Sequence, residues 1–424
     1  MQLKSRKSRL KGSVLIPASK SHTIRAVAIA ALADGDSLIH NPLASSDAEA
    51  SVRCYTALGA RVDTSDAATW KVSGIGGQIT PPAETIDVGN SGTTLRIAMG
   101  SAALADPGQS TTFTGDEQIQ SRPVGPLLNA LTDLGASCES LKGNGNAPVR
   151  ITGQLEGGRT SIEAKTSQYL SSLLMCTPLA VGDTEIDVTL LNEPGYVQMT
   201  LDWLDKQGII YENDNLRHFR IQGGQSYKAF ELPVPADFSS ATFFLCGAAL
   251  FGDEVTLEGL DFADSQPDKA VVDYLRAMGA DITVGDNAIT VRSSALHGVE
   301  IDMNATPDAL PAMAVTAALA EGTTRLVNVP QARNKETDRI ACMAQELQKL
   351  GARVEELPDG LVVQGGALKA AQVHGHSDHR IVMALALAGL ALDEPCVIDT
   401  AEAMSVTFPT FVELMRSLGA EMTL

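Results

Sequence analysis

The sequence lacks the features that mark several classes of protein. It contains no run of about 18 apolar residues, so we expect no transmembrane helix. The basic start, MQLKSRKSRLKGS, has no apolar segment of the kind found in secretory signals, and we expect a cytoplasmic location. Lys and Arg total 32 against 51 Asp and Glu, a net charge of −19. This balance argues against a surface for nucleic acid or an anionic membrane, so an anionic substrate would need a locally basic pocket.

Cysteine chemistry is also sparse. The six cysteines form no CxxC pair and most lie in apolar helical contexts, which predicts buried, reduced thiols. They are Cys54, Cys138, Cys176, Cys246, Cys342 and Cys396.

What the sequence does contain is an internal repeat. The chain of 424 residues is too long for one ordinary core, which favours two domains. A phrase of the type LGA recurs six times, and each copy is typical of a helix that ends on glycine and runs into a strand. The six glycines, 68 to 76 residues apart, are Gly59, Gly135, Gly208, Gly279, Gly351 and Gly419.

A second series runs in phase with the first. Polar clusters precede Ala-rich helices at 19–25, 89–96, 165–172, 236–243, 305–313 and 376–383. Short β-like stretches lie between the two series, so each repeat reads as a mixed α/β unit. In the first cluster, PASKSHTIRAVAIAALA, the apolar residues follow the spacing of a helix face packed on a core.

The repeats also predict the domain boundaries. The last repeat stops at Leu424 before its final strands, and the N-terminal stretch resembles the missing piece. We therefore expect one domain of residues 1–18 and 233–424, and an inserted domain of residues 19–232, with three repeats each.

Cations occupy the starts of the Ala-rich helices, where the helix dipole disfavours them. Free N–H groups make these helix starts anion sites, so cations there indicate a bound anion. The alternative is that they are solvated or paired with local acids. The six cations are Lys20, Arg25, Arg96, Arg122, Arg339 and Arg380. If the helices converge on a cleft, we expect it to be open when empty and to close on its ligand.

Two acids stand beside these cations. KETDR (335–339) is predicted to open a helix, with Lys335, Glu336 and Arg339 in its first turns. Asp308 taken alone is typical of a helix cap. Together with Glu336 it forms a candidate acid–base pair.

HGHSDHR (374–380) invites a test for metal binding. His374, His376 and His379 are close in sequence, but no HExxH motif or cysteine accompanies them and Gly375 indicates a loop. We expect no metal site here.

The motifs together resemble the EPSP synthase (3-phosphoshikimate 1-carboxyvinyltransferase) family over essentially the whole chain. The matching runs are SKSHTIR, GNSGTTLR, SRPVGPLL, TSQYLSSLLM, PDALPAMAVTAAL, KETDRI and DHRIVMALALA. The resemblance implies an α/β (α+β) fold of two domains, each with three βαβαββ units around a pseudo-threefold axis, and an active site in the interdomain cleft.

The implied reaction transfers the enolpyruvyl group of phosphoenolpyruvate to the 5-hydroxyl of shikimate 3-phosphate and releases phosphate. It proceeds by addition and elimination through a tetrahedral intermediate, in the shikimate pathway to chorismate and the aromatic amino acids. The resemblance implies that no metal or organic cofactor is required. From the acidic charge balance we expect no nucleic-acid or membrane partner, and we expect a monomer.

The family's site residues carry over onto matching positions. The implied catalytic residues are Lys20, Asp308 and Glu336. Those implied for shikimate 3-phosphate are Lys20, Ser21, Arg25, Thr166, Ser167, Gln168, Tyr196, Asp308, Gln331 and Lys335. Those implied for phosphoenolpyruvate are Lys20, Gly92, Arg122, Gln168, Arg339, His379 and Arg380.

Three positions depart from the family pattern. Gln331 stands where many members have Asn, and NEPGY (192–196) replaces a Ser-containing loop. Val406 stands where many members have lysine, so one cation of the site is absent or is supplied elsewhere. Sensitivity to glyphosate stays open.

Two other functions remain as alternatives. One is UDP-N-acetylglucosamine 1-carboxyvinyltransferase, which has the same fold, but GDEQIQSRP (115–123) lacks the reactive cysteine of that family. The other is a non-catalytic sugar-phosphate binding protein, which would need the cations but not the acid pair.

Overall fold

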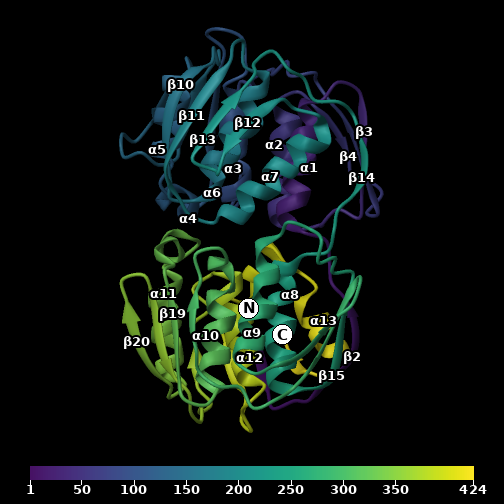
Figure 1. Cartoon of the computed structure of the whole chain (residues 1–424), viewed down its shortest axis with the longest axis vertical. Helices are drawn as coiled ribbons and strands as arrows, with labels where there is room; N and C mark the ends of the chain where they lie inside the picture. Colours follow the sequence, from purple (N-terminus) through teal and green to yellow (C-terminus); the bar gives the residue numbers. More distant parts are fainter. The chain divides into compact units, whose positions relative to one another are not determined.

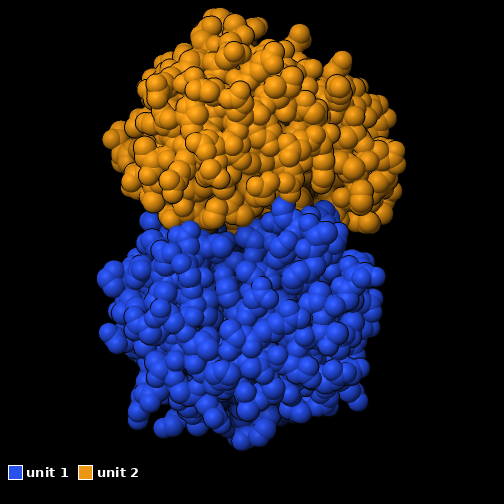
Figure 2. Space-filling view, in the orientation of Figure 1, with its two compact units in different colours: residues 1–17, 235–424 blue, residues 18–234 orange.

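The computed structural model describes all 424 residues, which divide into two compact units (Figures 1 and 2). Unit 1 comprises Met1–Pro17 and Pro235–Leu424, and unit 2 comprises Ala18–Val234. Both chain termini therefore belong to unit 1. None of the helices combines the length and apolarity that crossing a membrane requires.

Unit 2 contains three four-stranded sheets. The first has the order β14 (Glu231–Pro233), β3 (Asp36–His40), β5 (Thr69–Ser73), β4 (Arg61–Asp63). The second has the order β6 (Ile86–Asp87), β7 (Ser110–Thr114), β9 (Val149–Thr152), β8 (Ser137–Ser140). The third has the order β10 (Gly158–Ala164), β11 (Thr184–Leu191), β13 (His218–Ile221), β12 (Tyr211–Asp214). The helices are α1 (Lys20–Leu32), α2 (Ser46–Ala57), α3 (Gly92–Ala102), α4 (Glu117–Ser121), α5 (Gly125–Asp133), α6 (Ser167–Cys176) and α7 (Pro194–Gln207), with a 3-10 helix at Thr177–Leu179.

Unit 1 also contains three four-stranded sheets. The first has the order β16 (Asp281–Val284), β17 (Ala288–Arg292), β15 (Gly252–Glu258), β2 (Leu10–Leu15). The second has the order β18 (Glu300–Asp302), β19 (Thr323–Val327), β21 (Gly360–Gln364), β20 (Arg353–Leu357). The third has the order β22 (Gln372–Val373), β23 (Cys396–Ile398), β1 (Leu3–Arg6), β24 (Glu421–Thr423). The helices are α8 (Phe238–Phe251), α9 (Ala270–Ala277), α10 (Leu310–Leu319), α11 (Arg339–Lys349), α12 (His379–Gly389) and α13 (Phe411–Ser417). The 3-10 helices are Pro267–Lys269, Pro307–Ala309, Pro330–Asn334 and Ala401–Val406.

Every sheet has the same topology, and the predicted fold class is confirmed. In β18-α10-β19-α11-β20-β21, for example, β18 and β19 are parallel, and β21 lies antiparallel between β19 and β20. A helix covers each parallel crossover, which is the usual solution for joining parallel strands.

The N-terminal strands complete two repeats of unit 1. β1 pairs with β23 and β24 and so supplies the strand that the last repeat lacks. β2 pairs in parallel with β15 and opens the repeat that contains α8. In unit 2, β14 plays the same part by pairing with β3.

The Ala-rich helices form the centre of each unit, with the strands outside them (Figure 1). In unit 2, α3 packs against α1 and α6, and in unit 1, α8, α10 and α12 pack against one another. These helices are more buried than the sequence pattern indicates. In α1 every residue from His22 to Leu32 is buried, where the spacing predicts one buried face. Small side chains permit this close packing on all sides.

Capping explains the polar clusters. The side chains of Ser19, Ser91, Thr166, Asp237 and Asp378 each accept a hydrogen bond from a backbone N–H in the first turn of the helix that follows. At the other end, all six repeat glycines have positive φ, so the helix ends were predicted correctly. The six cysteines are all free thiols, four of them buried.

Candidate active site

In unit 2 most predicted site residues lie near the starts of α1, α3 and α6, and α3 packs against both other helices. Arg122 is the C-cap residue of α4, and Tyr196 lies in α7. Lys20 is the first residue of α1, and its Nζ lies 3.2 Å from a carboxylate oxygen of Asp47. Asp47 is buried in the first turn of α2. Lys20 is therefore paired with an acid, as the alternative interpretation of the cations held, although this acid belongs to another helix and is not close to Lys20 in sequence.

Arg25 is buried, and its guanidinium bonds only to neutral oxygens. It donates to the Ser21 carbonyl (3.0 Å), the Thr200 hydroxyl (2.9 Å) and the Tyr196 carbonyl (3.2 Å), with a longer bond to the Ser171 hydroxyl (3.4 Å). Burial lowers the pKa of Arg25 to about 10. Arg25 thus stays charged at neutral pH without a carboxylate partner.

The start of α3 brings two further arginines together. A Cβ on Gly92 would lie 2.7 Å from Nη1 of Arg122 and 2.8 Å from Nη1 of Arg96, so both guanidinium groups lie over this glycine. Arg96 also donates to the amide oxygen of Gln168 at 2.6 Å, and Gln168 in turn donates to Thr93. Glycine is required here because any side chain would displace the two cations.

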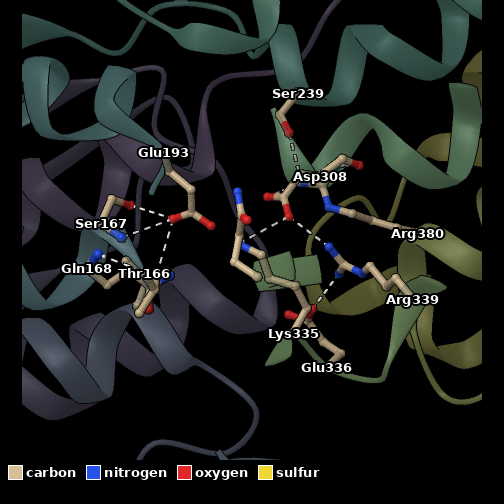
Figure 3. Close-up of polar contacts among 12 residues, drawn as sticks. Thr166, Ser167, Gln168, Glu193, Ser239, Asp308, Lys335, Glu336, Arg339 and Arg380 are labelled. Atoms are coloured by element: carbon tan, nitrogen blue, oxygen red, sulfur yellow. Dashed lines mark hydrogen bonds and ion pairs between the residues drawn. The ribbon is translucent and has the colours of Figure 1, made fainter. Parts of the chain in front are cut away.

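A carboxylate occupies the start of α6 (Figure 3). Oε2 of Glu193 accepts hydrogen bonds from the Ser167 hydroxyl (2.7 Å), the Ser167 N–H (3.1 Å) and the Thr166 hydroxyl (3.2 Å). Tyr196 lies in the first turn of α7, just beyond Glu193. The sequence marked NEPGY as unusual but did not assign Glu193 to the site.

In unit 1 the site centres on Arg339, the first residue of α11, which is 1 % exposed. Its guanidinium donates to Asp378 through Nε (2.8 Å) and Nη2 (3.2 Å), and to Asp308 through Nη1 (2.7 Å). It also donates to Glu336 through Nη2. Three acids thus surround one guanidinium, and Figure 3 shows two of them, Asp308 and Glu336.

Asp308 contacts two further cations. The Nη2 atom of Arg380 lies 3.3 Å from Oδ2 of Asp308, and the Nζ atom of Lys335 lies 3.7 Å from Oδ1. Arg380 also donates to the Ser239 hydroxyl at 2.8 Å. Burial alone would raise the pKa of Asp308, but the cations Arg380, Lys335 and Arg339 outweigh it and lower that pKa far below its usual range. Asp308 is therefore firmly ionised.

Asp378 and His379 link this cluster to α12. Asp378 is fully buried and accepts from the backbone N–H of Arg380 and the hydroxyl of Thr337. Burial would raise the pKa of Asp378, but Arg339 lowers it. Burial lowers the pKa of His379 to about 3, so its imidazole is neutral, and its Nε2 atom is buried without a hydrogen-bond partner.

Gln331 lies on the 3-10 helix Pro330–Asn334. It donates to the Asn304 carbonyl at 2.8 Å, while its amide oxygen is buried without a partner. The amide oxygen of Gln331 is thus an acceptor that is free for a ligand.

Val406 is the last residue of the 3-10 helix Ala401–Val406.

Three sequence interpretations need correction. Lys335 and Glu336 precede α11, which begins only at Arg339 because Asp338 is the N-cap. Asp308 lies in a 3-10 helix with no side-chain cap, so pairing with cations rather than capping accounts for it. The third correction concerns the interpretation that the cations at the helix starts have no acidic partner within the protein. It fails for Arg339, Lys20 and Arg380, because acids distant in sequence neutralise them.

The rings of His374 and His376 lie edge to face, with their centroids 4.4 Å apart, but each ring bonds to a different acid. His374 bonds to Asp399 (2.6 Å) and His376 to Glu346 (2.8 Å), and both acids also hold backbone N–H groups of this loop. No group of three His, Cys, Asp or Glu side chains is placed to hold a metal ion. The expectation about metals stays a prediction.

Comparison with known proteins gives a consistent result. The model of the family "EPSP synthase (3-phosphoshikimate 1-carboxyvinyltransferase)" matches residues 4–415. The chain is 52 % identical over 423 residues to a 3-phosphoshikimate 1-carboxyvinyltransferase of Acetivibrio thermocellus, covering 100 % of this chain and 99 % of the relative. It is also 52 % identical to the protein of that name from Ruminiclostridium cellulolyticum, covering 100 % of both. A solved structure of EPSP synthase from Acinetobacter baumannii superposes with a TM-score of 0.83 at 27 % identity, covering 100 % of both chains.

Proposed function

This chain belongs to the EPSP synthase family, and we propose that it transfers the enolpyruvyl group of phosphoenolpyruvate to the 5-hydroxyl of shikimate 3-phosphate, releasing phosphate in the shikimate pathway. It is a transferase. The observation that carries the proposal is 52 % identity over the whole chain to relatives named for this reaction. The buried arginines of unit 2 support it, because both substrates are anions: Arg25 and Arg96 lie near the starts of α1 and α3, and Arg122 follows α4.

Shikimate 3-phosphate is proposed to bind mainly to unit 2. Arg25 supports this, because a buried guanidinium with only neutral partners is stabilised by an arriving anion. The proposed contacts are Lys20, Ser21, Arg25, Thr166, Ser167, Gln168 and Tyr196, together with Asp308, Gln331 and Lys335 of unit 1. The free amide oxygen of Gln331 suits a hydroxyl of the substrate.

Phosphoenolpyruvate is proposed to bind Lys20, Gly92, Arg122, Gln168, Arg339, His379 and Arg380. Two guanidinium groups over Gly92 form a positive surface in unit 2. Neutral His379 can offer a hydrogen bond without adding charge.

The chemistry needs one proton delivered and one removed. The 5-hydroxyl adds to C2 of phosphoenolpyruvate, Glu336 protonates the methylene carbon, and Asp308 accepts the hydroxyl proton. Elimination reverses these transfers: the bond from C2 to the phosphate oxygen breaks, a methyl proton returns to Glu336, and Asp308 gives its proton to the leaving phosphate, which leaves the enolpyruvyl ether and phosphate. Lys20, which contacts both substrates in this scheme, offsets the charge that develops.

The ion pairs of Asp308 bear on this mechanism. A carboxylate whose pKa is far below neutrality is a weak base, so Asp308 in its present pairing is poorly suited to accept a proton. When the phosphoenolpyruvate anion draws Arg339 and Arg380 away, the pKa of Asp308 rises and its basicity increases. Substrate binding thereby activates the base.

A phosphate-release assay tests the proposal. Release that requires both phosphoenolpyruvate and shikimate 3-phosphate supports it, and tight binding without release would refute it in favour of a binding protein. Release only with UDP-N-acetylglucosamine would assign the chain to the related transferase. We further propose a cytoplasmic monomer that needs no metal or organic cofactor, which gel filtration and activity in the presence of a chelator would check.

A further inference from the structure

Glu193 places a carboxylate among the hydrogen-bond donors at the start of α6. One oxygen accepts three bonds, from the two side-chain hydroxyls of Thr166 and Ser167 and from the Ser167 N–H (Figure 3). The side chain is buried, with Glu193 only 1 % exposed. These donors and the helix dipole form an anion site, and the anion that fills it belongs to the protein itself.

The backbone directs Glu193 into this position. Its φ of 59° lies in the left-handed region, which residues other than glycine seldom adopt. The preceding residue, Asn192, is held by hydrogen bonds to the carbonyls of Ala164 and Lys165. Pro194 then opens α7. The loop is thus fixed on both sides of the carboxylate that it presents.

The same donors are among the contacts proposed above for shikimate 3-phosphate, and its phosphate is the group that donors at a helix start suit best. Two anions cannot share them, because each donor hydrogen serves one acceptor well and like charges in a buried site repel. The tethered carboxylate also competes at a high effective concentration. A ligand must therefore offer more charge than a single carboxylate to take its place.

We propose that Glu193 is an internal competitor for the Thr166–Ser167 anion site, and that the substrate phosphate binds by displacing it. Glu193 is then a specificity-determining residue, which raises the threshold for occupancy so that a phosphate dianion enters and a weaker anion does not. This inference rests on the proposed function, which identifies the displacing phosphate as that of shikimate 3-phosphate.

Glu193 is also connected to Arg25 through two hydrogen bonds of the Tyr196 backbone. The Tyr196 N–H donates to the Glu193 carbonyl, and the Tyr196 carbonyl accepts from Arg25. The residue that carries the carboxylate is therefore joined by one turn to Arg25, a second cation proposed to bind shikimate 3-phosphate.

The test compares Glu193→Gln with a matched control, Glu212→Gln. Both remove one negative charge from unit 2, but Glu212 is exposed on β12 and pairs with Arg220. The expected result is a KM for shikimate 3-phosphate about tenfold lower in E193Q, since a neutral amide holds the hydroxyls less strongly than a carboxylate. The KM for phosphoenolpyruvate should stay within about twofold, and E212Q should match the unmodified protein.

Binding of inorganic phosphate supplies a readout that needs no turnover. Calorimetry should show tighter phosphate binding to E193Q than to the unmodified protein. A folded E193Q that binds phosphate and shikimate 3-phosphate equally or more weakly would overturn the inference. If the unmodified protein releases no phosphate from its substrates, the proposed function fails, and the calorimetry still decides the role of Glu193.

A crystal of the unmodified protein soaked in phosphate covers the case in which E193Q does not fold. The inference requires phosphate on the Ser167 N–H with the Glu193 carboxylate moved away from it. Phosphate bound there while Glu193 keeps its three bonds, or no phosphate at concentrations where calorimetry detects binding, would refute displacement.

Discussion

Asp378→Asn is the sharpest test of the charge network in unit 1. Asp378 is fully buried, binds the Arg339 guanidinium through both oxygens, and caps α12 through the Arg380 N–H. Asparagine is nearly isosteric, so the substitution removes charge while leaving the packing intact. Its NH₂ group must also face a donor, either the guanidinium or the Thr337 hydroxyl.

The magnitude follows from the burial of this pair. Removing one partner of a buried ion pair costs about 3–5 kcal/mol, and the lower end applies because Arg339 keeps Asp308 and Glu336. A loss of about 3 kcal/mol lowers Tm by roughly 6–12 °C for a unit of this size. Misplacement of Arg339 should also reduce kcat/KM by about 10².

Calorimetry and the phosphate-release assay measure the two effects. The control is Glu300→Gln, which breaks an exposed pair with Arg325 in the same unit and should cost no more than about 1 kcal/mol. If Asp378→Asn melts within about 2 °C of the unmodified protein and keeps its kcat/KM, the buried network neither stabilises unit 1 nor positions Arg339, and the reasoning is refuted.

Three further predictions concern pH, the glycine at α3 and the loop before α12. The pKa values of Asp308, Asp378 and His379 are lowered in the folded protein, so the unfolded state binds more protons. Unit 1 should therefore lose stability as the pH falls below about 6.5, and more steeply below about 4. Hydrogen exchange measured from pH 7 to 3 should show unit 1 opening progressively, and constant protection would contradict this. In Gly92→Ala the new Cβ would lie 2.7 and 2.8 Å from two guanidinium groups, which would have to move. The KM for phosphoenolpyruvate should therefore rise about tenfold, with little change in the KM for shikimate 3-phosphate. Equal changes in both KM values would argue against a local effect. The buried carboxylate of Glu346 binds the loop leading to α12 by hydrogen bonds, and Glu346→Gln would weaken these bonds. Both Tm and kcat should therefore fall, with kcat reduced about tenfold. A lower Tm with an unchanged kcat would limit Glu346 to a structural role.

The site was predictable where its chemistry is local. The cations and hydroxyls at the helix starts follow polar caps and precede apolar runs, a pattern that can be read along the chain. Lys20 stands at the first position of α1, where the sequence predicts a cation at a helix start. Arg339 stands at the first position of α11, whereas the sequence predicts a helix that already opens at Lys335.

Their partners were not predictable, because ion pairing depends on distance in space. Asp47 lies in another helix from Lys20, and Asp378 reaches Arg339 across 39 residues of sequence. Glu193 had a weak signal in NEPGY, but nothing in that motif indicates that its carboxylate binds at Ser167. Only the packing of α6 beside α7 brings these two residues together.

The amino-acid sequence by itself determined the repeat, the helix ends at glycine and the family, because capping, periodicity and motif order are properties of short segments. Tertiary structure alone decided which strands complete which sheets and which charges are neutralised. β1 and β2 follow each other in the chain yet join different sheets. Arg339 is surrounded by acids while Arg25 has none, although both are buried near the start of a helix, because Coulomb energy depends on what packing brings within a few ångströms.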